Sequence, residues 1–328
     1  MISTTMKLGG GGKATNDFIK NYIIKYFGNV YLNELRDASK LMINGNISFT
    51  TDSFVVKPEF FPGGDIGKLA VYGTCNDLAV SGAKPKFLSL SLIVSEGYSL
   101  EKLDKILNSI KHAVEEIDVK IVCGDTKVVE RSEEPSIFIN TTGIGELAVD
   151  LNNYNKINIG DKVIITSDIA RHGLAVLSER NELNVDTEII SDCCNLYKIF
   201  EHVGYDGIKF ARDATRGGVA AVLNEIKEHC NKGFLIEEDR MPIEESVKYL
   251  CEFLGFDMLE IANEGVAVLI CENDRADEIV LKLKELEIAK NASVVGEVTD
   301  CEKVLLKNIY GGLRVVEMPD GNLLPRIC

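Results

Sequence analysis

The sequence lacks any apolar run near the length that crosses a membrane. No stretch of the 328 residues approaches the roughly 20 consecutive apolar residues of a spanning helix. The N-terminal segment MISTTMKLGGGG has neither the apolar core nor the cleavage site of a signal peptide. We therefore expect a cytoplasmic protein that does not enter a membrane.

Positive charge is also scarce. The chain carries 36 Lys and Arg against 51 Asp and Glu, which gives a net charge of −15 and a pI near 4.9. A chain of this charge repels the phosphate backbone of nucleic acids and anionic lipid surfaces, so general binding to either is excluded. Any phosphate site must be built locally.

The nine cysteines include no C-x-x-C pair and no nearby His at metal-ligand spacing, which disfavours a zinc site. Their odd number in a cytosolic chain indicates thiols, and most lie in apolar runs such as VKIVCGD, where a buried thiol behaves as a small hydrophobic residue. Cys328 differs because it is the last residue of the chain.

The length and the 45% hydrophobic content allow more than one core, so two domains are expected. In residues 1–150, patterns of period 2 predict strands over 47–56, 86–95, 119–129 and 136–147, and helical spacing predicts helices over 16–27, 68–82 and 99–117. This order predicts an α+β domain whose mostly antiparallel sheet is covered on one face by helices.

A polar, Asn-rich stretch at residues 148–160 is interpreted as a linker. The second domain, residues 151–312, should also be α+β. Its predicted strands are 162–168, 233–239, 265–272 and 292–298, and its predicted helices are 173–180, 188–203, 217–230, 244–255 and 275–287. Residues 313–328 are predicted to form a flexible tail.

Four glycines, residues 9–12, precede Lys13 and a predicted helix. Backbone N–H groups at Gly11 and Gly12, with the charge of Lys13, would suit an anion. A disordered leader is an equal alternative for this segment. The spacing is not that of the P-loop G-x-x-x-x-G-K-[ST], so a P-loop nucleotidase is disfavoured.

Acidic residues recur at expected strand ends and turns of the first domain. They are Asp52 in TTDS, Asp65 in PGGD, Asp77 in TCND and Asp125 in CGDT. Magnesium takes a few carboxylate oxygens together with nucleotide phosphates, so such a set favours a Mg²⁺–nucleotide site. Any one of them alone is more often a turn or cap residue.

Three further residues are candidates for the chemistry. Lys127 follows Asp125 by two positions and so shares its face of a strand, although a solvated surface pair is an alternative. Arg216 in DATRGG is available for phosphate. Glu264 lies between an apolar helix and an apolar strand, where a carboxyl is either poised as a base or a plain helix-terminal residue.

The tail PDGNLLPRIC is the most specific feature. Pro319 and Pro325 prevent a closing helix, and the ten residues can reach roughly 30 Å at about 3.3 Å each. The thiol of Cys328 can therefore visit two places. A frayed end with an accidental Cys is the alternative.

Taken together, GGGGKATND, TTDSFVVKPEFFPGGDIGKLAVYGTCNDLAVSGAKP, CGDTKVV, NTTGIG, DATRGG, ANEG and the terminal PRIC resemble the HypE family of hydrogenase maturation proteins. That family belongs to the PurM-like superfamily of aminoimidazole ribonucleotide synthetase and selenophosphate synthetase. The resemblance implies two α+β domains, dimerisation through the N-terminal sheet, and ATP with Mg²⁺ between the domains.

The resemblance also implies residue roles. Nucleotide and metal positions of the family correspond to Lys13, Asp52, Asp65, Asn76, Asp77, Asp125 and Thr126. The catalytic Lys, Glu and Cys of the family correspond to Lys127, Glu264 and Cys328.

The activity that the resemblance implies is ATP-dependent. HypF would place a carbamoyl group on Cys328, and ATP would drive its dehydration to a thiocyanate, from which cyanide passes to a HypC–HypD complex and on to the iron of [NiFe]-hydrogenase. Two other hypotheses are a related ATPase that activates a soluble amide and ignores Cys328, and a thiol carrier that uses Cys328 without ATP.

Overall fold

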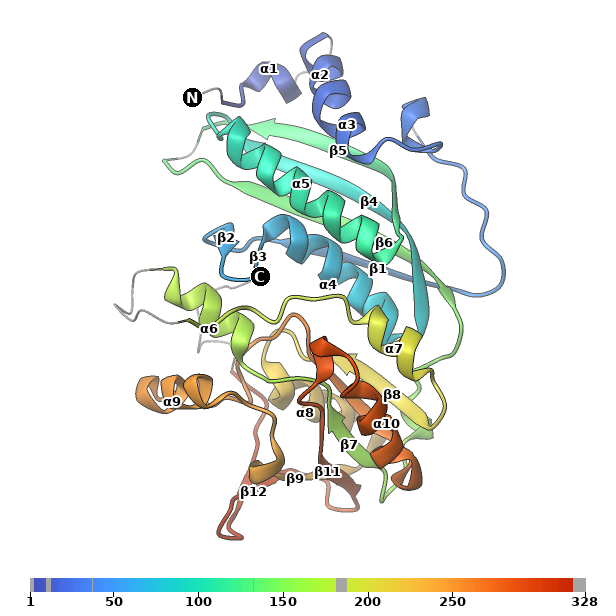
Figure 1. Cartoon of the computed structure of the whole chain (residues 1–328), viewed down its shortest axis with the longest axis vertical. Helices are drawn as coiled ribbons and strands as arrows, with labels where there is room; N and C mark the ends of the chain where they lie inside the picture. The colour runs from blue at the N-terminus through green and yellow to red at the C-terminus, as the bar shows by residue number, and fades with distance from the viewer. Residues whose placement is uncertain (1–2, 10–12, 37, 132, 181–187, 321–328) are drawn as a thin grey trace.

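The computed structural model describes residues 3–9, 13–36, 38–131, 133–180 and 188–320. The chain forms two α+β halves, one above the other in Figure 1, each with its own sheet. This arrangement confirms the fold class expected from the sequence. Within the described residues, no helix combines the length and apolar character that a bilayer crossing requires.

The N-terminal sheet has the strand order β1-β6-β4-β5. Its strands are β1 (Ile47–Phe54), β4 (Ala83–Ser95), β5 (Lys120–Val129) and β6 (Ile137–Leu147). All neighbours are antiparallel except β4 and β5, which run parallel. A short hairpin of β2 (Phe60–Phe61) and β3 (Gly64–Asp65) precedes the first long helix.

Two long helices, α4 (Ile66–Val80) and α5 (Leu100–Ile117), cover one face of this sheet, as Figure 1 shows. Helix α5 is amphipathic and buries one stripe, whereas α4 is buried almost all round. The reason is that α4 lies between the sheet and the C-terminal half, where Ala79 and Val80 join the core of that half.

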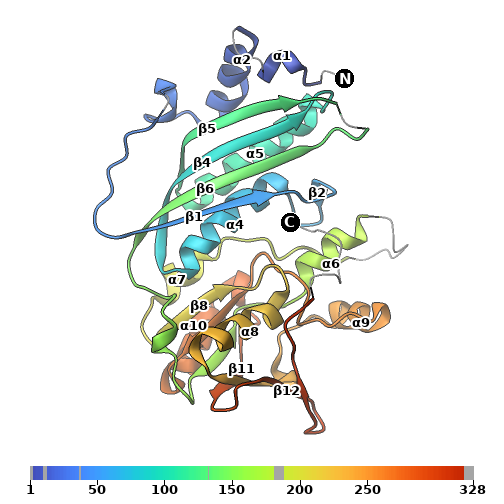
Figure 2. The ribbon, with the colours of Figure 1, turned by 180° about the vertical axis from the view of Figure 1, so that it is seen from behind.

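The other face of the N-terminal sheet is largely exposed in the part of the chain that the structure describes, and we call it the open face; Figure 2 shows the sheet from that side. Alternation along β1 directs Phe49, Thr51 and Ser53 to this face. Large apolar side chains on it are exposed, among them Phe49 at 64% and Ile93 at 41%.

A helical leader precedes the sheet. It consists of α1 (Met6–Gly9), α2 (Lys13–Phe18), the π-helical turn η1 (Ile19–Ile24), α3 (Lys25–Phe27) and the 3₁₀ turn η2 (Leu32–Glu34). The helix predicted over 16–27 is therefore present, with a π-helical centre.

The C-terminal half has a seven-stranded sheet in the order β13-β12-β9-β11-β7-β10-β8. The strands are β7 (Lys162–Ile165), β8 (Ile208–Asp213), β9 (Gly233–Glu237), β10 (Ala267–Cys271), β11 (Ser293–Thr299), β12 (Val304–Lys307) and β13 (Leu313–Val315). Its α-helices are α6 (Arg171–Ser178), α7 (Tyr197–Val203), α8 (Gly218–Cys230), α9 (Glu245–Leu254) and α10 (Ala276–Leu283).

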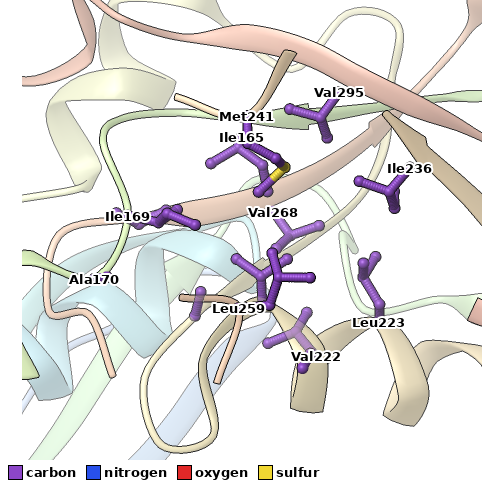
Figure 3. Packing of buried hydrophobic residues seen from close by; sticks show 14 of the residues in the cluster. Ile165, Ile169, Ala170, Val222, Leu223, Ile236, Met241, Leu259, Val268 and Val295 are labelled. Carbon is purple, nitrogen blue, oxygen red and sulfur yellow. The ribbon is translucent and has the colours of Figure 1, made fainter. Parts of the chain in front are cut away.

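Short 3₁₀ turns complete this half at η3 (Tyr154–Lys156), η4 (Glu238–Arg240), η5 (Asn273–Arg275) and η6 (Glu287–Ala289). Figure 3 shows how the core forms: Ile165, Val268 and Val295 from the sheet meet Val222 and Leu223 of α8. These side chains are buried because the apolar face of the sheet and the apolar face of α8 pack against each other.

Two sequence-based expectations need correction here. The helix predicted over 188–203 covers only Tyr197–Val203, because residues 188–196 have no regular secondary structure and bond to other segments. Residues 313–316, predicted as the start of a flexible tail, belong instead to the C-terminal half, because Leu313–Val315 pairs with β12 and Val316 is buried, whereas residues 321–328 lie outside the described residues. Strands β8, β12 and β13 were not predicted.

Candidate functional site

Asp52 and Asp77 meet on the helix-covered side of the N-terminal sheet. Asp52 comes from the edge strand β1 and Asp77 from α4, which packs across it. The Thr50 hydroxyl donates to Asp77 Oδ2 at 2.7 Å, and the Thr74 hydroxyl lies 3.5 Å from Asp52 Oδ2. The two carboxyls predicted to bind metal are thus neighbours.

Burial and, to a lesser degree, the negative charges of Asp213 and Asp52 together raise the pKa of Asp77 to about 8. Asp213, at the end of β8, has its pKa raised to about 6, again chiefly by burial, with the charge of Arg212 acting in the opposite direction. Carboxyls from both halves of the molecule therefore crowd one place and disfavour each other's ionisation.

Glu264 belongs to the same group. It is only 4% exposed, in the turn before β10, and a Cβ placed on Gly73 of α4 would lie 3.9 Å from its Oε2. Residues 73 and 77 share a face of the helix, which sets Glu264 beside Asp77. Burial raises the pKa of Glu264 well above its usual range, and the charges of four aspartates add to the effect. We call Asp52, Asp77, Asp213 and Glu264 the acidic cluster.

The acidic cluster has the donor chemistry that Mg²⁺ prefers, and crowded carboxylates gain from a cation between them. Among the described residues, however, no group of three or more His, Cys, Asp or Glu is arranged to enclose a metal ion. A metal held by one or two carboxylates and completed by water and phosphate oxygens fits this set.

Asp125 and Lys127 lie elsewhere in the same chain. Their side chains form an ion pair, with Lys127 Nζ 3.1 Å from Asp125 Oδ2, and are 58% and 62% exposed. Strand β5 is the edge opposite β1, so two strands, or roughly 14 Å, separate it from Asp52. The pair also faces the open side of the sheet, because Asp125 aligns with Ser91 and Lys127 with Ile93. Within one chain, the Asp125–Lys127 pair therefore lies away from the acidic cluster.

Other predicted residues have definite places. Asp65 is the N-cap of α4, and its Oδ1 accepts from the N–H groups of Gly67 and Lys68 at 2.7 and 3.0 Å. The backbone N–H of Thr126 donates to Asp125 Oδ1 at 2.8 Å. Arg216 is exposed beside Asp213, whose pKa its charge lowers.

The remaining predictions concern the two ends of the chain and one buried amide. Lys13 is exposed at the start of α2. Gly11, Gly12 and Cys328 lie outside the described residues. Asn76 is 2% exposed, and its side-chain amide bonds to backbone groups of the C-terminal half.

Sequence reasoning missed Asp213 and Asp192. Asp213 begins the DATRGG motif, from which only Arg216 was selected, and a carboxyl at a strand end was the available signal. Asp192 was hidden in the stretch interpreted as helix, and no sequence pattern separates it from a surface acid.

Comparison with known proteins places the chain in a family. The model for the N-terminal domain of AIR synthase related proteins matches residues 36–147, and the model for their C-terminal domain matches residues 158–307. Carbamoyl dehydratase HypE of Bradyrhizobium diazoefficiens is 40% identical over 98% of this chain and 94% of its own length. The chain belongs to the HypE family. The Escherichia coli K12 member is 37% identical over 98% of both chains.

Solved structures of HypE proteins agree with this assignment. A hydrogenase maturation protein HypE in complex with ATP superimposes with a TM-score of 0.94, at 38% identity, over 98% of this chain and 99% of that one. The HypE chain of a HypE–HypF complex is 46% identical, with a TM-score of 0.81 over 92% and 99%. Thiamine monophosphate kinase from Aquifex aeolicus, at 17% identity and a TM-score of 0.62, shares the fold.

Proposed function

We propose that this protein uses ATP to dehydrate a carbamoyl group carried on its own Cys328 to a thiocyanate, and so supplies cyanide for the iron of [NiFe]-hydrogenase. The observation that carries the proposal is the acidic cluster, where Glu264 meets three aspartates at the contact between the two halves. The carbamoyl dehydratase name of full-length relatives and the ATP complex of one HypE structure support it.

In the proposed reaction the thiocarbamate oxygen attacks the γ-phosphorus of ATP, which releases ADP. The carbon–oxygen bond then breaks, and the oxygen leaves as phosphate while nitrogen loses both protons and forms the triple bond of S–C≡N. Activation is needed because an amide oxygen is a poor leaving group, whereas phosphate leaves readily.

Glu264 would accept a proton from the nitrogen, which requires its ionised form. Magnesium bound at Asp52 and Asp77 with the ATP phosphates would supply positive charge that offsets the carboxylates around Glu264. The low exposure of Glu264 keeps bulk water away from the proton transfer, and this protects ATP from simple hydrolysis.

In this proposal, Lys127 and Asp125 contribute to the active site of a second copy of the chain and not to that of their own. The open face of the N-terminal sheet carries exposed Ile93 beside Lys127 and exposed Phe49 on the opposite edge strand, and an apolar face of that kind favours association. A homodimer through the N-terminal sheet would have to bring Lys127 of one protomer past the edge strand β1 of the other, which carries Asp52 of the acidic cluster. Lys13 and Arg216 would contact phosphate groups of ATP.

HypF is the proposed carbamoyl donor, supported by the solved HypE–HypF complex of a relative with 46% identity. The proposed cyanide acceptor is a HypC–HypD complex. Cys328 must approach the acidic cluster and then leave it, and the chain from Pro319 onward has the length for both positions.

Intact mass spectrometry tests the proposal. The protein is incubated with HypF, carbamoyl phosphate and ATP beside a Cys328→Ala variant. The wild type should gain one carbamoyl group and then lose one water, the second step only with hydrolysable ATP, while the variant keeps its mass. Equal mass changes in both proteins would refute the role of Cys328 and favour a related ATPase with a soluble substrate.

A further inference from the structure

A segment without regular secondary structure, residues 190–196, runs between the two halves of the molecule, and we call it the strap. Its Ser191 N–H donates to Pro62 O of the N-terminal half at 2.9 Å. Turns on both sides approach it closely. A Cβ on Gly63 would lie 2.9 Å from Ser191 O, and one on Gly265 would lie 1.9 Å from Asp192 O, so both positions require glycine.

Asn76 of α4 fastens the strap to the turn that carries Glu264. Its Nδ2 donates to Cys194 O at 3.0 Å and to Glu264 O at 3.2 Å, while its Oδ1 accepts from Leu196 N at 2.8 Å. Two carbonyl partners and one N–H partner fix the orientation of the amide. Both N–H donors of the side chain are thereby used within the protein.

Asp192, on the strap itself, holds the same turn from the other side. Its Oδ2 accepts from Glu264 N at 2.9 Å and from Gly265 N at 2.8 Å. The backbone of Glu264 is therefore held at its N–H by Asp192 and at its C=O by Asn76. These bonds are buried, where a lost partner leaves a polar group unsatisfied.

We propose that Asn76 and Asp192 are positioning residues that hold Glu264 against the acidic cluster. The inference deepens the proposed function and rests on it. Asn76 and Asp77 are consecutive residues of α4, so one rigid helix fixes the turn of Glu264 and also carries an acidic residue of the cluster. The amide of Asn76 then serves the protein backbone and does not contact the nucleotide.

The first test is Asn76→Asp, which keeps the shape of the side chain but replaces the two donated bonds with repulsion between oxygens. The kcat of dehydration should fall on the order of 10- to 100-fold, while the KM for ATP stays within about twofold. Asn29→Asp is the matched control. Asn29 Nδ2 also donates to two carbonyls, Phe27 O at 3.0 Å and Ile121 O at 2.7 Å, but within the N-terminal half alone.

Amide hydrogen exchange provides a readout that does not depend on activity. In Asn76→Asp the N–H groups of Glu264 and Gly265, which bond to Asp192 and not to Asn76, should exchange at least tenfold faster. Asn29→Asp should leave them unchanged. Unchanged exchange in Asn76→Asp would overturn the proposal even if the wild type had no dehydratase activity.

Asp192 provides the second pair of variants in case Asn76→Asp does not fold. Asp192→Asn keeps an oxygen that can accept from both N–H groups, whereas Asp192→Ala removes it. At the pH optimum of each variant, Asp192→Asn should retain at least tenfold more kcat than Asp192→Ala. Equal kcat values, or a raised KM for ATP with normal kcat in Asn76→Asp, would overturn the positioning role.

Discussion

The acidic cluster and the Asp125–Lys127 pair are both candidate parts of one active site, but their surroundings are opposite. The cluster is partly buried between two halves of one chain, and the pKa values of Asp77 and Glu264 are raised by burial and by the neighbouring aspartate charges. The pair is more than half exposed on the open face of a sheet. The contrast fits the proposal that one chain builds the acidic part of the site and that a second chain supplies its basic part.

The largest effect that separates these two parts is expected from Glu264→Gln. Removal of the proposed base should lower the kcat of dehydration by about 100-fold or more, because general bases contribute on that scale. Single-turnover mass spectrometry of carbamoylated protein measures the rate. Glu272→Gln is the control, since Glu272 is exposed beyond the end of β10. A Glu264→Gln rate within twofold of wild type would contradict the assignment.

Mixing two inactive variants tests whether the basic part comes from a second chain. Lys127→Ala and Glu264→Gln each damage one part of the site, and a mixed dimer would contain one intact site. An equal mixture, unfolded and refolded together, should recover about one quarter of wild-type activity, since half of the dimers are mixed and each has one good site. No recovery would place Lys127 and Glu264 in the same chain's site.

Phe49→Asp should weaken the proposed dimer. Phe49 is 64% exposed on the open sheet face, and a charge there would be buried on association. The dissociation constant measured by sedimentation should rise at least about tenfold. Tyr310→Asp is the control, because Tyr310 is 89% exposed on the C-terminal half. Equal effects of the two variants would argue against this interface.

The smallest effect concerns stability against pH without nucleotide or metal. The pKa of Asp77 rises to about 8 on folding from about 3.9 in an unfolded chain. Its contribution to stability is complete below pH 4 and is lost as pH rises through 8, because only the unfolded state ionises freely between these values.

Asp77→Asn should therefore unfold at higher urea than wild type at pH 8, by at least about 1 kcal/mol in the free energy of unfolding, with a smaller difference at pH 5. Urea titrations at the two pH values measure it. Asp118→Asn, a change at an exposed helix end, should show no such pH dependence. A pH-independent difference for Asp77→Asn would mean that its charge is not the cause.

Sequence periodicity predicted most of the N-terminal half, because the apolar residues of its strands and helices recur at the regular spacing of each element. Leu88, Leu90 and Leu92 alternate along β4, and the apolar stripe of α5 recurs at helical spacing. The strap was predicted as helix because its local spacing permits one. Hydrogen bonds to Asn76, Pro62 and Glu264, all distant in sequence, take the place of helical bonds.

The site was predictable in its residue types and less so in its assembly. Asp52, Asp77 and Glu264 were selected from motifs, and the structure brings them together. Asp213 joins them only because β8 pairs with β10, where Asp213 aligns with Ala267. Asp125 shares their chemistry but lies on the other face and the other edge of the sheet, and sequence spacing carries no information on that separation.

The strap also affects how the protein responds to heat and denaturant. Hydrogen bonds that join the two halves also place Glu264, so the halves cannot separate at the strap without a loss of catalytic geometry. Each half has its own sheet and main core, and apolar contacts of Ala79 and Val80 with the C-terminal core also cross the junction, so we expect the strap to loosen before either sheet unfolds. Moderate warming should therefore inactivate the enzyme reversibly at temperatures where its secondary structure is still intact.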